Sequence, residues 1–151
     1  MNRRTACRPY HQHGVGLIEV LVSVLVLSIG LLGIAWVQTR ALSSNNSSMA
    51  RSMAVVASYS ILDALRADRV NATAYNGTVT TNACPDPGTL VQTQLSNWCN
   101  ELAAALGAVA NTTGEVTCAA DGECTITITY DDSRIGAGGN ATQTVVTKGM
   151  L

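Results

Sequence analysis

The chain has 151 residues, of which 13% are charged, and a formal net charge of −1. This length allows one small domain with a modest core. Three of the nine basic residues are Arg3, Arg4 and Arg8, so the chain after Gly14 holds six basic residues against ten acidic ones, a net charge of −4. An acidic balance of this kind argues against nucleic acid as a partner.

Residues 15–37 are apolar enough to cross a membrane. The 18 residues from Val20 to Val37 are interrupted only by serines and glycines, and this is close to the length that a spanning helix needs. Basic residues before the segment keep the N-terminus in the cytoplasm. We therefore expect a single-pass membrane protein whose residues after Arg40 lie across the membrane from the N-terminus, and membrane lipid is its first partner.

Glu19 is the only charged residue between Arg8 and Arg40. A carboxylate inside a membrane segment costs about 2.5–3.5 kcal/mol at the helix centre and less near the interface, so it usually has a function and a partner. The alternative is an interfacial glutamate whose carboxylate reaches the lipid headgroups or favours the helix dipole.

The order of residues around Glu19 resembles that of the prepilins of the type IV filament family. A short basic leader ends in Gly14, an acid follows at the fifth position after it, and a long apolar helix comes next. The resemblance implies that prepilin peptidase removes residues 1–14 by cutting between Gly14 and Val15. It also implies that Val15 is N-methylated and that Glu19 pairs with the new N-terminus of a neighbouring subunit during assembly.

An ordinary secretory signal is the competing interpretation of this N-terminus, because it also combines basic and apolar segments. The apolar run is longer than the usual core of about 7–15 residues. The sequence around Ala35 also lacks a convincing cleavage site.

The second half of the helix, residues 38–71, is predicted to be amphipathic. If residues 16–71 form one helix, it is about 80 Å long. Arg51 and Arg69 are expected on the polar side. Gly30 and Gly33 favour close helix packing over a hinge. The predicted apolar stripe consists of Leu42, Met49, Met53, Val56, Ala57 and Ala64.

Four cysteines remain after Cys7 is removed with the leader, and they allow three pairings. Cys118 and Cys124 bracket a turn at Asp121–Gly122 between two predicted strands, which makes a Cys118–Cys124 bridge geometrically natural. The remaining pair is Cys84–Cys99, and its loop of about 15 residues is worth roughly 3 kcal/mol.

The rest of the chain gives little support for an enzyme, a metal site or a cofactor. Both histidines, His11 and His13, belong to the leader, so nucleophile activation by histidine and a zinc site are disfavoured. Asp131–Asp132 follow a strand and are expected to form a solvated turn. The glycines of residues 136–139 are expected in a flexible hairpin loop, because they lack the Lys-Ser/Thr of a phosphate-binding loop.

Residues 72–151 are predicted to form a globular head, and the fold class is α+β and type IV pilin-like. A loop over residues 71–89 precedes a helix over residues 91–106, which carries Leu95, Trp98, Leu102 and Leu106 on one face. Three strands are expected near residues 115–118, 124–130 and 142–147. They would form a small antiparallel sheet against the long helix.

Within the family, the segments LDALRADR and CTITITYDD most resemble the PilV type of minor pilin, or type IV pilus modification protein. This resemblance implies a low-abundance subunit that primes pilus assembly and lies at or near the pilus tip. The implied partners are other minor pilins, the major pilin, prepilin peptidase and the inner-membrane assembly machinery. A pseudopilin of type II secretion and a single-pass envelope protein are the alternatives.

Overall fold

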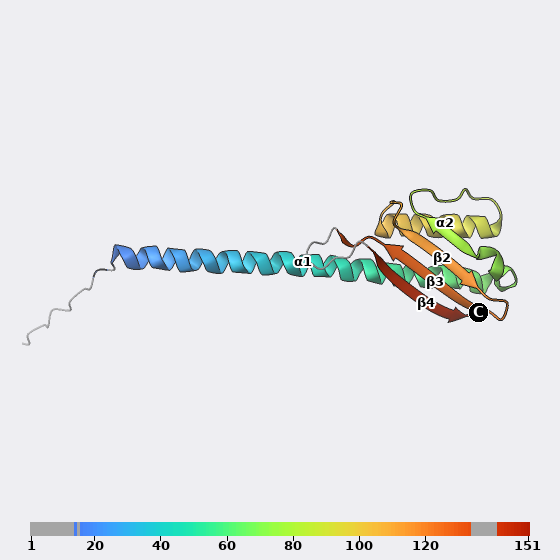
Figure 1. The fold of residues 1–151 in the computed structure, drawn as a ribbon, viewed down its shortest axis with the longest axis horizontal. Helices are drawn as coiled ribbons and strands as arrows, with labels where there is room; N and C mark the ends of the chain where they lie inside the picture. The colour runs from blue at the N-terminus through green and yellow to red at the C-terminus, as the bar shows by residue number, and fades with distance from the viewer. Residues whose placement is uncertain (1–13, 15, 134–141) are drawn as a thin grey trace, which may run out of the picture. The chain divides into compact units, whose positions relative to one another are not determined.

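The computed structural model describes residues 14, 16–133 and 142–151. These residues form a long helix α1, a 3-10 helix η1, a second helix α2 and four strands (Figure 1). The chain divides into two compact units, Met1–Arg40 and Ala41–Leu151. The α+β class and the pilin-like combination of a long N-terminal helix with a small antiparallel sheet are confirmed.

Helix α1 spans Leu17–Ala67 and continues well past the apolar segment. Serine and threonine hydroxyls in it bond to the carbonyl one turn earlier, as Ser28 does to Val24 at 2.7 Å. These bonds satisfy the hydroxyls without a partner outside the helix. The predicted continuation to residue 71 is wrong by four residues.

The early end of α1 has a local cause at Asp68. Its carboxylate accepts hydrogen bonds from the Asn71 amide at 2.8 Å and from the Tyr75 hydroxyl at 3.2 Å. Side-chain bonds of this kind compete with the helical backbone pattern. The chain continues as the 3-10 helix η1 over Arg69–Tyr75, in which Tyr75 is buried.

The buried face of α1 in the head differs from the predicted stripe. Of the predicted residues, Leu42, Met49, Met53 and Val56 are exposed, Ala57 is buried and Ala64 is partly buried. Alanines let a neighbouring element approach closely, and the Trp98 indole donates a hydrogen bond to the Ala57 carbonyl at 2.9 Å. The buried face consists of Ala54, Ala57, Ser58, Ile61, Leu62 and Leu65.

The sheet has four antiparallel strands in the order β1-β2-β3-β4, one more than predicted. Strand β1, Gly77–Thr80, lies inside the predicted loop over residues 71–89. It is only four residues long, and its pairing with β2 defines it rather than any local pattern. The other strands are β2, Thr113–Cys118; β3, Glu123–Tyr130; and β4, Gln143–Met150.

Helix α2 spans Leu90–Leu106, close to the prediction. Thr89 and Gln92 form a capping box, in which each side chain bonds to the backbone of the other residue. This arrangement satisfies two donors that a helix start leaves free. Trp98 and Leu102 are buried, whereas Leu95 and Leu106 pack at the edge of the core.

Both helices cover the same face of the sheet. The Trp98 and Leu102 side chains of α2 approach Gly114 of β2, and the Leu62 side chain of α1 approaches Gly149 of β4. The structure contains two disulfides, Cys84–Cys99 and Cys118–Cys124, with Cα–Cα distances of 5.6 and 4.0 Å. The first joins the loop after β1 to α2, and the second crosses the β2–β3 hairpin at the register pair Cys118–Cys124.

Candidate assembly site at the N-terminus

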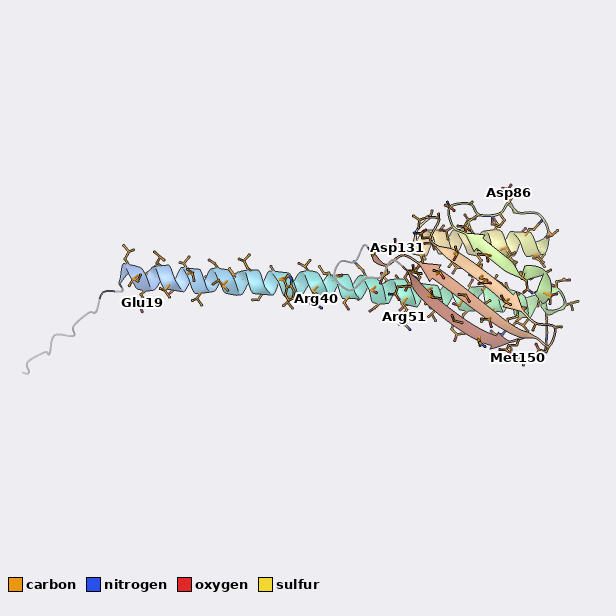
Figure 2. All side chains as sticks on the ribbon, viewed as in Figure 1. Glu19, Arg40, Arg51, Asp86, Asp131 and Met150 are labelled. Carbon is orange, nitrogen blue, oxygen red and sulfur yellow. A yellow bond between two sulfur atoms is a disulfide. The ribbon has the colours of Figure 1, made fainter. Side chains whose placement is uncertain are left out.

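Glu19 lies in the first turn of α1. Its backbone N–H bonds to the Gly16 carbonyl at 2.9 Å, and its own carbonyl accepts the Ser23 hydroxyl at 2.7 Å. The Glu19 side chain is exposed and projects from the helix near its start (Figure 2). Within the described part of the chain, no basic side chain forms an ion pair with it. The carboxylate is thus available to a group outside this chain.

The surface around Glu19 is apolar and uncovered. The most apolar window of α1 has a mean hydropathy of 2.6, and none of it is buried. By length and composition, α1 can therefore cross a membrane, which indicates a membrane-anchored protein. A side-chain carbon added at Gly30 or Gly33 would meet nothing within 4 Å, so both glycines leave the helix surface open to close approach.

The end of the apolar segment is marked by Trp36 and Arg40. The Arg40 guanidinium carbon lies 5.6 Å from the centre of the Trp36 ring, which is within the range of a cation–π contact. Tryptophan and arginine are both suited to the boundary between lipid and water. Trp36 lies within the C-terminal end of the predicted spanning segment, residues 15–37, and Arg40 follows that segment.

The predicted cleavage site is only partly described. Gly14 is exposed and outside any helix or strand. Val15, His11, His13 and the rest of residues 1–13 lie outside the described residues. The expected cut after Gly14 and the methylation of Val15 therefore remain predictions.

Of the paired acids after β3, Asp132 is not part of a solvated turn. Its side chain is only 3% exposed and accepts a hydrogen bond from the Ser47 hydroxyl of α1 at 2.5 Å. This bond ties the end of β3 to the long helix, and Ser47 carried no distinguishing signal within the polar run of residues 43–48. Asp131 caps its own turn by accepting the Ser133 backbone N–H at 2.8 Å. The predicted glycine loop over residues 136–139 lies outside the described residues.

Two tyrosines next to carboxylates have perturbed acidity. Burial raises the pKa of Tyr130 above 10.0, and the negative charge of Asp132 raises it further, while Arg51 lowers it. Burial also raises the pKa of Tyr75, with additional contributions from the charge of Asp68 and the hydrogen bond to it. Both phenols stay neutral at ordinary pH, and both act as structural groups in the head.

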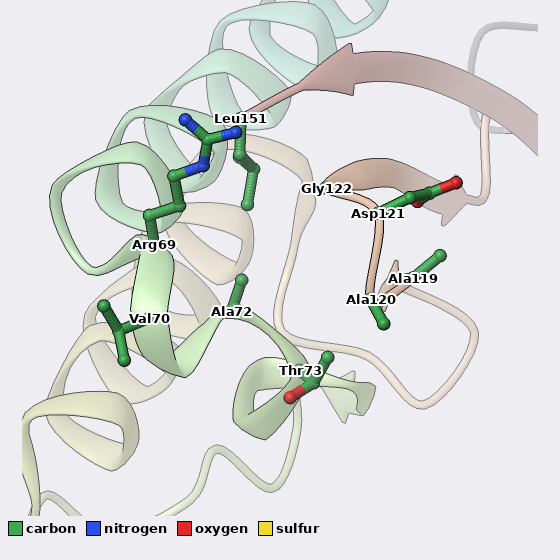
Figure 3. A pocket seen from close by; sticks show the side chains of 9 residues that line it. All are labelled: Arg69, Val70, Ala72, Thr73, Ala119, Ala120, Asp121, Gly122 and Leu151. Atoms are coloured by element: carbon green, nitrogen blue, oxygen red, sulfur yellow. The ribbon is translucent and has the colours of Figure 1, made fainter.

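A depression of about 300 Å³ lies at the end of the head between η1 and the β2–β3 turn (Figure 3). Arg69 and Asp121 are its charged residues, and alanine, valine, leucine, threonine and glycine complete its lining. This lining contains no thiol or imidazole that could serve as a nucleophile or base. Across residues 16–133 and 142–151, no three histidine, cysteine or acidic side chains are grouped as metal ligands.

Comparison with known families adds one finding at the N-terminus. Residues 10–35 match the prokaryotic N-terminal methylation motif, which covers both Gly14 and Glu19. No curated protein and no solved structure matches the chain. Proteins with this motif are structural pilins rather than enzymes. The chain thus has a type IV pilin-like leader, and the motif supports its assignment as a type IV pilin-like or pseudopilin-like protein.

Proposed function

We propose that the chain is a minor pilin that primes type IV pilus assembly and is then incorporated at or near the pilus tip. The observation that carries this proposal is the isolated, exposed Glu19 in the first turn of an apolar helix, inside the methylation motif. Its partners are other minor pilins, the major pilin and the inner-membrane assembly machinery. After assembly, the subunit moves from the inner membrane to the extracellular filament.

The assembly step depends on a charge created by prepilin peptidase. Cutting the bond between Gly14 and Val15 frees an ammonium group at Val15. The Glu19 carboxylate of an incoming subunit pairs with the ammonium of a docked neighbour. A charge buried without its partner costs about 3–5 kcal/mol, so only the register that pairs the two charges is stable.

The apolar half of α1 supports the transfer from lipid to filament. Its side chains are uncovered in the single chain. Lipid covers them before assembly, and the helices of neighbouring subunits cover them afterwards. Gly30 and Gly33 allow those helices to approach closely.

A deletion of the gene tests the proposal against its closest alternative. Loss of surface pili and of twitching, with protein secretion intact, is the expected result. Loss of exoprotein secretion with pili intact would instead identify a type II secretion pseudopilin.

The maturation step has a separate test. The chain is expressed with and without prepilin peptidase, and the purified products are weighed by mass spectrometry. We expect the peptidase to remove residues 1–14, and a methylated Val15 adds the mass of one methyl group. If the protein has the same mass whether or not the peptidase is present, it would be a single-pass envelope protein without a filament role.

A further inference from the structure

Strand β4 has an open edge. It pairs with β3 over all eight of its residues, and no other strand in residues 16–133 or 142–151 pairs with it. The Leu151 N–H bonds to the Gly122 carbonyl at 3.0 Å, which continues the β3–β4 ladder. Hydrogen-bonded positions recur at every second residue of an antiparallel pair. The backbone N–H and C=O groups of Thr144, Val146 and Lys148 therefore point away from β3.

The opposite edge of the sheet, at β1, is short and partly covered. Strand β1 has four residues. The Thr80 carbonyl accepts the Ala83 N–H at 2.9 Å, and the Cys99 sulfur lies 3.5 Å from the same oxygen. Natural proteins protect edge strands by shortness, prolines, bulges or a covering loop. Strand β1 is short and the loop after it covers the Thr80 carbonyl, whereas β4 is long, regular and free of proline.

The part of α1 beside β4 offers cover for one more strand. Leu62 and Arg66 of α1 lie against Gly149 of β4. Tyr59 and Val55 lie on the same side of the helix, one and two turns earlier. Tyr59 is 53% exposed and Val55 is partly buried. An added strand would bring its inward side chains against these two residues.

The direction of β4 restricts which strand can be added. The start of β4 pairs with the end of β3, near the Ser47–Asp132 contact, and its other end reaches Leu62. Strand β4 therefore runs in the same direction as α1, as its arrow shows in Figure 1. Two copies anchored in one membrane have parallel α1 helices, so their β4 strands cannot pair antiparallel. The strand order places β1 antiparallel to β4, but in this chain that edge is short and partly covered.

We propose that the β4 edge binds, by antiparallel strand addition, an exposed edge strand of a different pilin-like subunit. The unpaired backbone groups of β4 require an extended partner, and the Val55–Tyr59 surface requires apolar side chains at alternate positions. Because β1 is short and partly covered, sheet extension is favoured on the β4 side, and a row of heads ends at this chain. The proposed function supplies the identity of the partner and the shared membrane orientation; the open edge is a property of the head alone.

The test uses the full chain in detergent micelles and a labelled peptide of about ten residues that alternates valine and threonine. Its matched control is the same peptide with N-methylated amides on the edge that would face β4. We expect the unmodified peptide to bind at least about tenfold more tightly than the methylated one. Equal binding of the two peptides overturns the proposal, and this comparison needs no protein variant.

Two proline variants locate the site. Val146→Pro removes an N–H that points away from β3, so the head ladder stays intact while peptide affinity falls by about tenfold or more. Thr78→Pro makes the matching change on β1 and is expected to leave affinity unchanged. Equal effects of the two variants, or a dimer of the wild-type chain that Val146→Pro dissociates, would contradict the proposal. A deletion without a pilus defect would refute the proposed function and leave this binding result standing.

Discussion

Gly114 controls how closely α2 packs on the sheet, and we expect Gly114→Ala to destabilise the head. A side-chain carbon at this position would lie 2.5 Å from Cη2 of Trp98 and 2.7 Å from Cδ1 of Leu102. Carbon atoms prefer separations of about 3.5–4.0 Å, so both side chains would have to move by about 1 Å. Trp98 has little room to move, because it is buried and its indole N–H is bonded to Ala57. Overpacking of this kind costs about 1–3 kcal/mol.

Thermal unfolding of the full chain in detergent, followed by near-UV circular dichroism, measures the effect. A head of about 100 residues loses about 4–8 °C in Tm for each kcal/mol. Gly149→Ala is the matched control, since its new carbon would meet the ends of two side chains, Leu62 at 3.2 Å and Arg66 at 3.8 Å. We expect it to cost less than about 1 kcal/mol. A Gly114→Ala protein as stable as the wild type would refute this account of the α2 packing.

Three further predictions concern assembly, the disulfides and pH. Glu19→Ala is expected to leave leader cleavage intact, while incorporation into pili falls by about a hundredfold or more because a buried ammonium loses its partner. Immunoblotting of sheared pili measures incorporation. Normal incorporation would show that the Glu19 carboxylate is only an interfacial cap of the helix. Replacing both Cys84 and Cys99 by alanine should lower the free energy of unfolding by about 3 kcal/mol, because the disulfide closes a loop between residues 15 positions apart. Denaturant titration measures this change. A decrease in the free energy of unfolding of less than about 1 kcal/mol would contradict the loop-entropy argument. The free energy of unfolding of the head should fall above pH 10.0. The pKa values of Tyr75 and Tyr130 are raised in the folded state, so folding favours the neutral phenols, and this contribution to stability is lost as pH rises through the folded-state pKa values. In denaturation experiments, the Tyr75→Phe and Tyr130→Phe variants should lose less stability at alkaline pH than the wild type.

The long helix shows both the strength and the limit of sequence patterns. An 18-residue apolar run and helical periodicity predicted α1, since each depends on neighbours along the chain. Apolar residues at helical spacing defined the predicted stripe, yet its larger members are exposed: Leu42, Met49, Met53 and Val56. Instead, α2 contacts α1 at Ala57, where Trp98 bonds to the backbone carbonyl, and β4 contacts α1 at Leu62. Hydrophobicity alone does not report which side of a helix has a neighbour.

In the head, too, local sequence patterns predicted some elements, whereas features that depend on tertiary contacts were missed. Alternation along residues 124–130 predicted β3, and the spacing of apolar residues predicted α2. Strand β1 was missed, because four residues carry almost no local signal and the strand forms by pairing with β2. The buried position of Asp132 was also missed, since its partner Ser47 is distant in the chain. Contacts of this kind depend on chain topology, which local propensity does not encode.

The N-terminal sequence by itself determined the pilin-like character of this protein. Gly14, Glu19 and the apolar run lie within a linear methylation motif, residues 10–35, so the match does not depend on the fold. The tertiary structure alone decided which surfaces of the head are closed and which are open. The pairing of β1 with β2 and the Ser47–Asp132 contact join residues far apart in the chain, and they exist only because packing and strand pairing bring those residues together.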